Sequence, residues 1–595
     1  MQLRIRTATD QFRSSIVQQA RLLFQAGGLT LILLACLSGV VAGIVVTGLS
    51  RLAGLMHERF FSLPLDVRLS GLLELSRPSD ALVPVAGGIV MGISILLLRK
   101  FRNRAMVDPI EANALYGGRI SLTDSLIVTA QTIVSNGFGA SVGLEAAYTQ
   151  MGSGLSSRIG RFFGIRRNDV RTLVGCGAAG AIAAAFGAPL TGAFYGFELI
   201  IGVYSLANVA PVMAAAVSAS LTATWLGAEQ FPIAIGAIPQ LAAGQYIPFL
   251  LLGLIAGLGS VGIMRLVATV ERVFAAARVH PALRPVVGGA AIGLLGLVSP
   301  QVLSGGHGAM QMFLSNHFAL ATVATVFLLK LAASALSLGT GFRGGLFFAS
   351  LFLGALLGNM FATVANAALP FLGIHTTMAA VVGMTSLAVG IVGGPLTMTF
   401  LALEATRDLA ITGVVLAASI VSSLVVRSIF GYSFSTWRFH LRGETIRSAH
   451  DVGWMRNLTV RSMMRTDART VHVNTTVPAF RTLFPLGSAQ RVVAIDDEGR
   501  YEGMIFVPEA YADEPSAPSE PDTVRRLLRF PDTVLVPPLN AKGAAEIFEK
   551  AKAEELPVVD GLKTRKVVGL LTEGHLMRRY SEELEKVRRD LSGEI

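Results

Sequence analysis

The chain has little charge and almost no cysteine. Of its 595 residues, 15% are Asp, Glu, Lys or Arg and 52% are hydrophobic, whereas a soluble globular domain usually carries about 25% charged residues. Its two cysteines, Cys36 and Cys176, both lie in apolar runs. They predict neither a disulfide framework nor a metal site. The basic start of the chain leads directly into a long apolar run, which favours a cytoplasmic N-terminus over a cleaved signal peptide.

The charge that is present lies unevenly. Residues 444–595 contain 22 Lys or Arg and 24 Asp or Glu, whereas residues 1–443 contain 28 and 15. This change near Arg442 predicts a boundary between a hydrophobic part and a soluble tail. Because the basic excess belongs to the hydrophobic part, we attribute it to residues that flank membrane spans, and we predict no nucleic-acid partner.

Long apolar runs predict an integral membrane protein, since about 20 apolar residues cross a bilayer. The runs that qualify are 29–49, 81–98, 209–226, 247–267, 285–303, 320–338, 347–369 and 411–426. Shorter, glycine-rich apolar pieces are 126–148, 173–186, 190–203, 378–392 and 396–403. Several of these are too short to span, and broken helices occur at membrane depth only where they line a cavity or are buried in protein.

The hydrophobic part contains an internal repeat. Gly187-Ala188-Pro189-Leu190-Thr191 recurs 206 residues later as Gly393-Gly394-Pro395-Leu396-Thr397, and Gly143-Leu144 recurs 202 residues later as Gly345-Leu346. Duplicated membrane halves with interrupted helices predict a binding site at their interface, near the bilayer midplane. Helix N-termini at such an interface offer partial positive charge, which suits a small anion.

Glu145 is the sharpest functional signal, because it is an ionisable residue inside an apolar, glycine-rich piece. A carboxylate beside an anion site would occupy that site when ionised and leave it when protonated or displaced. The alternative is a buried, hydrogen-bonded glutamate that only holds helices together.

The order of these motifs resembles that of the voltage-gated chloride channel (CLC) family, whose members are anion channels and proton-coupled chloride antiporters. The family's Gly-Arg/Lys-Glu-Gly-Pro motif matches Gly143-Leu144-Glu145-Ala146-Ala147. Its Gly-x-Phe-x-Pro motif matches Gly345-Leu346-Phe347-Phe348-Ala349, and its Asn-Ala-Pro-Leu-x-Gly stretch matches Gly187-Ala188-Pro189-Leu190-Thr191-Gly192. With the tail included, the resemblance covers about residues 28–580.

The resemblance implies an all-α polytopic membrane domain of two inverted repeats with broken helices, and a homodimer with one anion pathway per subunit. It makes Glu145 the gate. The residues that would face the anion, chiefly through backbone amides, are Gly143, Leu144, Ala146, Gly345, Leu346, Phe347, Phe348 and Ser435. Ser435, or its neighbour Phe434, stands where the family has a pore tyrosine, and the family's anion-binding serine has no counterpart in 103–111.

We predict passive, voltage-gated transport of chloride or a similar small anion. In the antiporters a second glutamate passes protons, and that position aligns with Leu199, which cannot carry a proton. A proton-coupled chloride antiporter with another proton donor remains the first alternative, and a cation transporter regulated by its tail is the second. We find no catalytic triad, phosphate loop or metal-ligand cluster in the sequence, and so predict no enzyme and no metal.

Four further charged residues of the apolar part, among the many it contains, carry specific expectations. Arg343 precedes a predicted anion-facing helix and would either attract anions or be a solvated vestibule or interface charge. For Lys330 we expect snorkelling or pairing with a buried carboxylate. Glu198 and Glu404 occupy equivalent repeat positions, and we expect both to cap or pair within the packed helices.

The tail contains a repeat of its own, two copies of a strand–helix–strand–strand unit, which resembles a pair of cystathionine-β-synthase-type (CBS) modules. Such modules commonly bind adenine nucleotides. Of the ribose-contacting pattern only Thr572 is retained, because His575 replaces the aspartate of the second copy. Nucleotide binding is therefore a weak expectation, and no other cofactor is predicted.

The predicted organisation is a cytoplasmic N-terminal segment, an anion-conducting membrane domain, a linker, two CBS modules forming an α+β pair, and a charged C-terminal tail. Their bounds are 1–27, 28–440, 441–456, 457–515, 516–582 and 583–595. We expect a multi-pass protein of the plasma (inner) membrane with both termini cytoplasmic.

Overall fold

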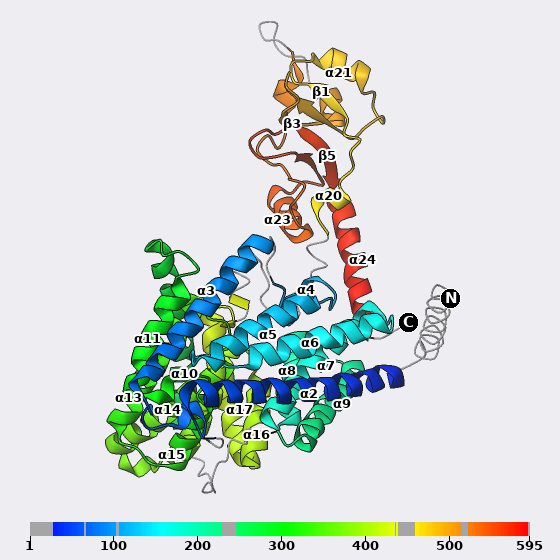
Figure 1. Cartoon of the computed structure of the whole chain (residues 1–595). Helices are drawn as coiled ribbons and strands as arrows, with labels where there is room; N and C mark the ends of the chain where they lie inside the picture. Colours follow the sequence, from blue (N-terminus) through cyan, green and yellow to red (C-terminus); the bar gives the residue numbers. More distant parts are fainter. Residues whose placement is uncertain are drawn as a thin grey trace, which may run out of the picture. The chain divides into compact units, whose positions relative to one another are not determined.

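The computed structural model describes residues 28–64, 67–102, 106–228, 246–434, 436–437, 458–512 and 522–592. The chain divides into two compact units, 1–451 and 452–595, which are described separately below (Figure 1). The predicted N-terminal segment, the predicted linker and Ser435 lie outside the described residues. The finer domain bounds given above stay predictions.

Over the residues that the structure describes, the first unit is helical apart from one isolated bridge between two glycines. Its first half contains α2 (Gly28–Phe61), α3 (Val83–Phe101), α4 (Pro109–Leu115), α5 (Leu122–Gly137), α6 (Glu145–Phe162), α7 (Arg167–Phe186), α8 (Pro189–Tyr195), the π-helix η3 (Gly196–Ile201) and α9 (Leu206–Trp225). Its second half contains α10 (Tyr246–Ala276), α11 (Arg284–Val298), α12 (His307–Ser315), α13 (Leu320–Thr340), α14 (Phe347–Ala368), α15 (Thr376–Val392), α16 (Pro395–Thr406) and α17 (Leu409–Ile429). Short 3-10 turns η1 (Leu69–Gly71), η2 (Pro78–Leu82), η5 (Pro300–Val302) and η6 (Pro370–Leu372) connect them.

Within the described residues, eight helices are long and apolar enough to cross a membrane. The chain is thus a multi-pass membrane protein, as its composition predicts. One predicted span is wrong in length: 285–303 forms only the 15-residue α11, because Pro285 stands at its first turn and Ser299-Pro300 ends it. Another is longer than predicted, since 173–186 belongs to α7, which has 20 residues and is almost entirely buried.

Each half contains an equivalent pair of helices that pack closely together at glycines. In the first half α6 packs against α7, where Gly152 and Gly177 face each other's carbonyl groups. In the second half α14 packs against α15 in the same way through Gly354 and Gly383. A Cβ atom at any of the four would overlap the facing backbone, so glycine is required for the close approach. The duplication seen in the sequence therefore recurs in the packing.

The second unit repeats one small motif. Its first copy has β1 (Thr470–His472), α21 (Val477–Leu483), β2 (Arg491–Ile495) and β3 (Tyr501–Phe506), with β1 parallel and β3 antiparallel to β2. Its second copy has α23 (Ala541–Ala551) and the antiparallel pair β4 (Glu555–Val559) and β5 (Val567–Thr572), with a parallel bridge from Leu535 to Val558 in place of the first strand. Shorter helices are α20 (Val460–Met463), α22 (Val507–Ala512) and η7 (Val524–Leu527), and α24 (Glu573–Ser592) follows β5.

The predicted strand–helix–strand–strand order is complete in the first copy, whereas the second copy has only the bridge at Leu535 where its first strand was expected. Helix α22 follows the first copy, and residues 513–521 lie outside the described residues. A shared apolar cluster, which includes Val493 and Met504 from the first copy and Val559 from the second, packs the two copies against each other.

Candidate functional site

The site is built where two broken helices start. Helix α6 begins at Glu145 and α14 at Phe347, and the residues just before them pair as a single antiparallel bridge. The Gly143 N–H donates to the Gly345 carbonyl at 2.9 Å, and the Gly345 N–H donates to the Gly143 carbonyl at 3.2 Å. The repeat thus brings equivalent glycines of the two halves into contact. Their N–H groups, which we expected to face an anion, each donate to the carbonyl of the other glycine instead.

The Glu145 side chain lies across this meeting point. It is 5% exposed, and its carboxylate interacts with the backbone N–H groups of Phe348 and of Glu145 itself. A Cβ atom added to Gly143 would overlap Oε2 of Glu145, and one added to Gly345 would lie 3.2 Å from it. The carboxylate therefore occupies the place where two helix N-termini offer partial positive charge.

The Glu145 carboxylate is only partly satisfied. Its Oε2 atom is buried and has no hydrogen-bond partner among the described residues. A buried acceptor without a donor costs about 1–3 kcal/mol, and more when it is charged. This cost favours any event that removes the carboxylate from the site, such as protonation or replacement by an anion.

Aromatic rings form the wall beside the helix starts. Phe186 lies 5.1 Å from Phe347 and 6.0 Å from Phe348, measured between ring centroids, and Tyr195 lies 6.1 Å from Phe347. The His307 ring stacks on Phe348 at 3.5 Å with an interplanar angle of 26°. Both phenylalanines that the sequence singled out are buried in this wall.

Two cavities flank the Gly143–Ala147 segment. One of about 740 Å³ is lined by Glu145, Ala146, Gly345, Leu346 and Phe347, among others. A second cavity, of about 130 Å³, is lined by Leu144 of the same segment, which does not line the first cavity. Leu144, Glu145 and Ala146 thus lie between two spaces, as the barrier in a pathway would. Ser435, the remaining predicted anion contact, lies outside the described residues.

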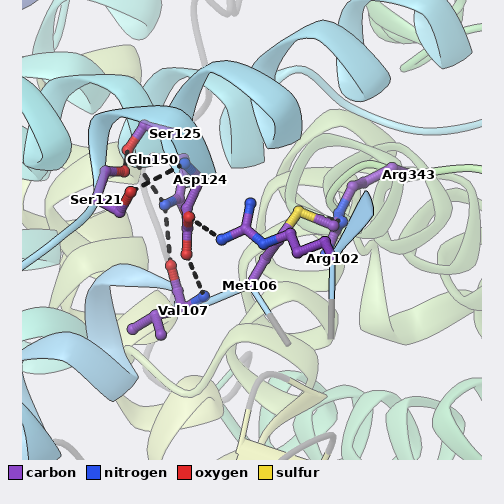
Figure 2. A network of polar contacts seen from close by, with 8 residues as sticks. All are labelled: Arg102, Met106, Val107, Ser121, Asp124, Ser125, Gln150 and Arg343. Atoms are coloured by element: carbon purple, nitrogen blue, oxygen red, sulfur yellow. Dashed lines mark hydrogen bonds and ion pairs between the residues drawn. The ribbon is translucent and has the colours of Figure 1, made fainter. Parts of the chain in front are cut away.

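A polar network holds the loop that enters the larger cavity (Figure 2). Asp124 forms an ion pair with Arg102 and accepts a hydrogen bond from the Val107 N–H at 3.4 Å. Gln150 on α6 donates to the Val107 carbonyl at 3.1 Å. Met106 and Val107 line the cavity. The loop therefore presents a methionine and backbone where the family has a serine. We did not single out Asp124 or Gln150 from the sequence, although a carboxylate and an amide in an apolar stretch were visible signals.

Arg343 and Lys330 both have local partners. The Nη1 atom of Arg343 donates to Gln131 Oε1 at 3.0 Å and to the Met106 sulfur at 3.4 Å. This guanidinium therefore helps to hold the same loop at the cavity wall. Lys330 is 0% exposed. Its Nζ donates to the carbonyls of Val302 at 3.1 Å and Ser304 at 2.8 Å. Lys330 therefore does not snorkel, because it is buried and loop carbonyls accept from its Nζ; the buried carboxylate of Glu145 lies within its electrostatic range.

Glu198 and Glu404 cap helices, as we expected from their repeat positions. Glu198 accepts from the N–H groups of Leu396 and Thr397 at the start of α16, and Glu404 accepts from those of Leu190 and Thr191 at the start of α8. Leu199, next to Glu198, is 9% exposed and lies in an apolar cluster. It brings no ionisable group to the site.

Thr572 lies in the second unit, at the end of β5. Its Oγ1 accepts a hydrogen bond from the His575 N–H at 3.3 Å, at the start of α24. This contact gives the hydroxyl a structural partner, and its role toward a nucleotide stays a prediction.

Comparisons with known proteins agree on one family. The sequence profile described as "Voltage gated chloride channel" matches residues 87–427. A ClcB-like protein of Ralstonia nicotianae is 31% identical over 356 residues, which cover 59% of this chain and 81% of the relative. The "Voltage-gated ClC-type chloride channel ClcB" of Escherichia coli O81 is 26% identical over 402 residues, which cover 67% of this chain and 96% of the relative.

Solved structures share the fold. A slow cyanobacterial Cl⁻/H⁺ antiporter superposes with a TM-score of 0.61 at 22% identity, covering 69% of this chain and 97% of that one. A CLC-type fluoride/proton antiporter gives a TM-score of 0.54 at 23% identity, with 68% and 95% covered. A eukaryotic CLC transporter gives 0.58 at 15% identity, with 92% and 97% covered. At these identities the likeness concerns the fold alone.

Proposed function

Because the chain belongs to the voltage-gated chloride channel family, we propose that it carries chloride or a similar small anion passively across the membrane, through a path that Glu145 opens and closes. Membership makes it an anion transporter and not an enzyme. Passive conduction and gating by one glutamate go beyond what family membership shows. The geometry around Glu145 supports both.

The position of the Glu145 carboxylate is the observation that carries this proposal. The carboxylate fills the junction of the α6 and α14 starts, between two cavities, and one of its oxygens has no hydrogen-bond partner among the described residues. An anion at that point would meet the same N–H groups of Glu145 and Phe348. Carboxylate and anion therefore compete, and the path opens when Glu145 is protonated or displaced.

The surroundings of Leu199 favour the passive mode. Proton coupling needs a second ionisable group that takes up the proton after Glu145 releases it. At the position where the antiporters carry that group, Leu199 packs with apolar neighbours such as Ile200. No proton can be held there.

Proton-coupled antiport is the second candidate, and Tyr195 favours it. Its hydroxyl reaches the side chain of Thr149 and lies within electrostatic range of both Asp108 and Glu145. Asp108 lines the larger cavity with Glu145 and would be the proton donor that Leu199 cannot be. Two of the solved structures of similar fold are of proton-coupled antiporters.

Reconstituted liposomes under combined chloride and pH gradients separate the two modes. Passive transport gives a reversal potential at the chloride equilibrium potential, whatever the pH gradient. Chloride accumulation driven by a pH gradient alone would establish antiport and overturn the passive mode. In the antiport case Asp108→Asn should uncouple the fluxes while chloride still moves.

For the rest of the molecule we propose what the resemblance implies. The tail would be a pair of CBS modules, 457–515 and 516–582, and the membrane domain a homodimer of the plasma (inner) membrane with both termini cytoplasmic. Light scattering of the detergent-extracted chain tests the dimer. A rise in the unfolding midpoint with adenine nucleotide, lost in Thr572→Ala, would establish the nucleotide site, and no rise would leave the tail without that ligand.

A further inference from the structure

Five exposed arginines gather where α6 ends and α7 begins, and we call them the arginine patch. They are Arg119 from the loop between α4 and α5, Arg158 and Arg161 from the end of α6, Arg166 just before α7, and Arg167 at its first position. Within 156–171 the single acidic residue is Asp169, which is half-buried and lies within electrostatic range of Arg166. The surface of this turn is therefore strongly positive.

The loop that carries Arg119 connects the two helix ends. On the α6 side, the Arg161 Nη2 donates to the Ile120 carbonyl at 2.9 Å. On the α7 side, the Arg167 guanidinium lies against Gly117, where an added Cβ atom would overlap its Nε. The loop is thus packed between the end of α6 and the start of α7, and the arginines of all three segments lie on one surface.

The arginine patch concentrates like charges. Arg158 and Arg119 both lie within electrostatic range of Arg161. Among the residues that the structure describes, none of the five arginines forms an ion pair with a carboxylate. An anionic group that binds between them would relieve their mutual repulsion. Phosphate is the group that the planar fork of a guanidinium matches best, because it can accept two hydrogen bonds from one arginine.

The arginine patch lies where two candidate membrane spans begin. One is α7, which starts at Arg167 itself. The other is α2, since Leu31 in its first turn packs against the same apolar cluster as Phe163 of the α6–α7 turn. On either side of Leu31, Leu29 and Leu33 are 71% and 53% exposed. Exposed leucines of a membrane helix face the acyl chains, so the patch stands beside lipid, near the level where the headgroups begin.

Two exposed aromatic side chains flank the arginine patch. Tyr116, in the same loop as Arg119, is 46% exposed, and Phe162, between Arg161 and the turn, is 54% exposed. Tyrosine is common at the boundary between a membrane and water, where its ring meets lipid and its hydroxyl meets water. Basic residues at that boundary favour the cytoplasmic side, and the cytoplasmic leaflet is the one that carries anionic lipid.

We propose that the arginine patch binds the phosphate groups of anionic phospholipids in the cytoplasmic leaflet. Arg119, Arg158 and Arg166 supply charge at the surface, while Arg161 and Arg167 also hold the loop between the helices. None of the five lines either cavity beside Glu145. The patch is thus a lipid-binding surface separate from the proposed gate, and it attaches the α6–α7 turn to the membrane surface.

Lipid titration of the full chain in detergent, followed by native mass spectrometry, tests this surface. The wild-type chain should bind phosphatidylglycerol about tenfold or more tightly than phosphatidylcholine, and raising the salt from about 0.1 M to about 1 M should weaken that preference. Arg158→Gln with Arg166→Gln should remove most of it, whereas Arg158→Lys with Arg166→Lys should keep most of it because the charges remain. Arg461→Gln with Arg525→Gln is the matched control, which removes two exposed arginines of the second unit and should bind as the wild type does.

Three results would overturn the proposal. They are equal affinity of the wild type for the two lipids, a preference that survives Arg158→Gln with Arg166→Gln, and competition by inorganic phosphate as strong as that by phosphatidylglycerol, which would identify a site for a soluble anion. If the glutamine variant does not fold, a photoactivatable phosphatidylglycerol decides with the wild type. Labelling within 156–171 supports the lipid site, and labelling only elsewhere in the chain excludes it.

Discussion

Glu198 and Glu404 cap each other's helices. Glu198 accepts hydrogen bonds from the start of α16, the helix that carries Glu404, and Glu404 accepts from the start of α8, which runs on into the π-helix that carries Glu198. Each carboxylate also accepts from a threonine hydroxyl, Thr397 at 2.7 Å and Thr191 at 2.6 Å. The same three contacts are thus made twice, in opposite directions, between the two halves.

Removing either carboxylate should cost similar stability. Glu198→Ala and Glu404→Ala each leave the N–H group of a half-buried leucine and the N–H and hydroxyl groups of a buried threonine without their charged acceptor. We expect this loss to lower the free energy of unfolding by about 2–3 kcal/mol. The unfolding midpoint in detergent measures this. Glu74→Ala, at an exposed loop position, is the control and should have no effect. A large loss in one variant and none in the other would contradict the equivalence of the two caps.

Neutralising Glu145 should remove gating. In Glu145→Gln the side chain keeps its size but no longer carries the charge that competes with an anion, so flux should lose most of its dependence on pH and voltage. A charge that crosses the membrane field contributes about 2.3 kcal/mol per 100 mV, which makes the voltage effect measurable in planar bilayers. Glu74→Gln serves as the control. Unchanged gating in Glu145→Gln would exclude Glu145 as the gate.

Substitutions of the two bridged glycines, Gly143 and Gly345, should disturb the gate to different degrees. In Gly143→Ala the new methyl group would overlap the Glu145 carboxylate, whereas in Gly345→Ala it would stand 3.2 Å away. We therefore expect Gly143→Ala to force the side chain out and raise flux at high pH, where the wild-type gate is closed. Gly345→Ala should show a smaller change. Liposome flux measured across pH compares them, and equal behaviour of both variants would argue against this geometry.

The stability of the tail should fall as pH rises through one carboxyl group. Burial raises the pKa of Glu555 above its ordinary value, against the opposing effect of the Arg491 guanidinium. The folded tail thus binds this proton more tightly than the unfolded chain does. Stability is therefore greatest below the ordinary pKa of glutamate and decreases as pH passes from there through the raised value.

Glu555→Gln should remove that pH dependence and protect β4 and β5 better at neutral pH. Hydrogen exchange of these strands in the full chain, followed over several pH values, measures it. Glu554→Gln is the matched control, because the Glu554 side chain is 78% exposed and that of Glu555 only 16%. A steeper loss of protection with pH in Glu555→Gln would contradict the argument.

Features that depend on local pattern could be predicted from the sequence. The length of the apolar runs predicted the membrane part. The internal repeats predicted which positions of the two halves are equivalent, including Glu198 and Glu404. The pairing of Gly143 with Gly345 could not be predicted, because a repeat says which positions are equivalent and not which of them touch. The hydrogen-bond partners of Lys330 could not be predicted for a related reason, because they are backbone carbonyls of a loop and every residue carries such a group.

The smaller of the two cavities shows that functional surfaces are subject to the same limit. His57, Arg68 and His307 line it. They come from three separate elements, and no spacing in the sequence links them. A lone histidine in an apolar stretch carries little information until its neighbours are known. Glu145 could be found early because a carboxylate within a membrane segment is rare by itself.

The reciprocal caps also determine when the start of α8 can be completed during synthesis of the chain. The N–H group of Leu190 that starts α8 is bound by Glu404, 214 residues later in the chain. At the usual 5–20 residues per second, the ribosome adds those residues in roughly 10–40 s. During that interval the start of α8 lacks its carboxylate acceptor. The start of α8 is therefore completed only after the second half of the membrane unit has been synthesised.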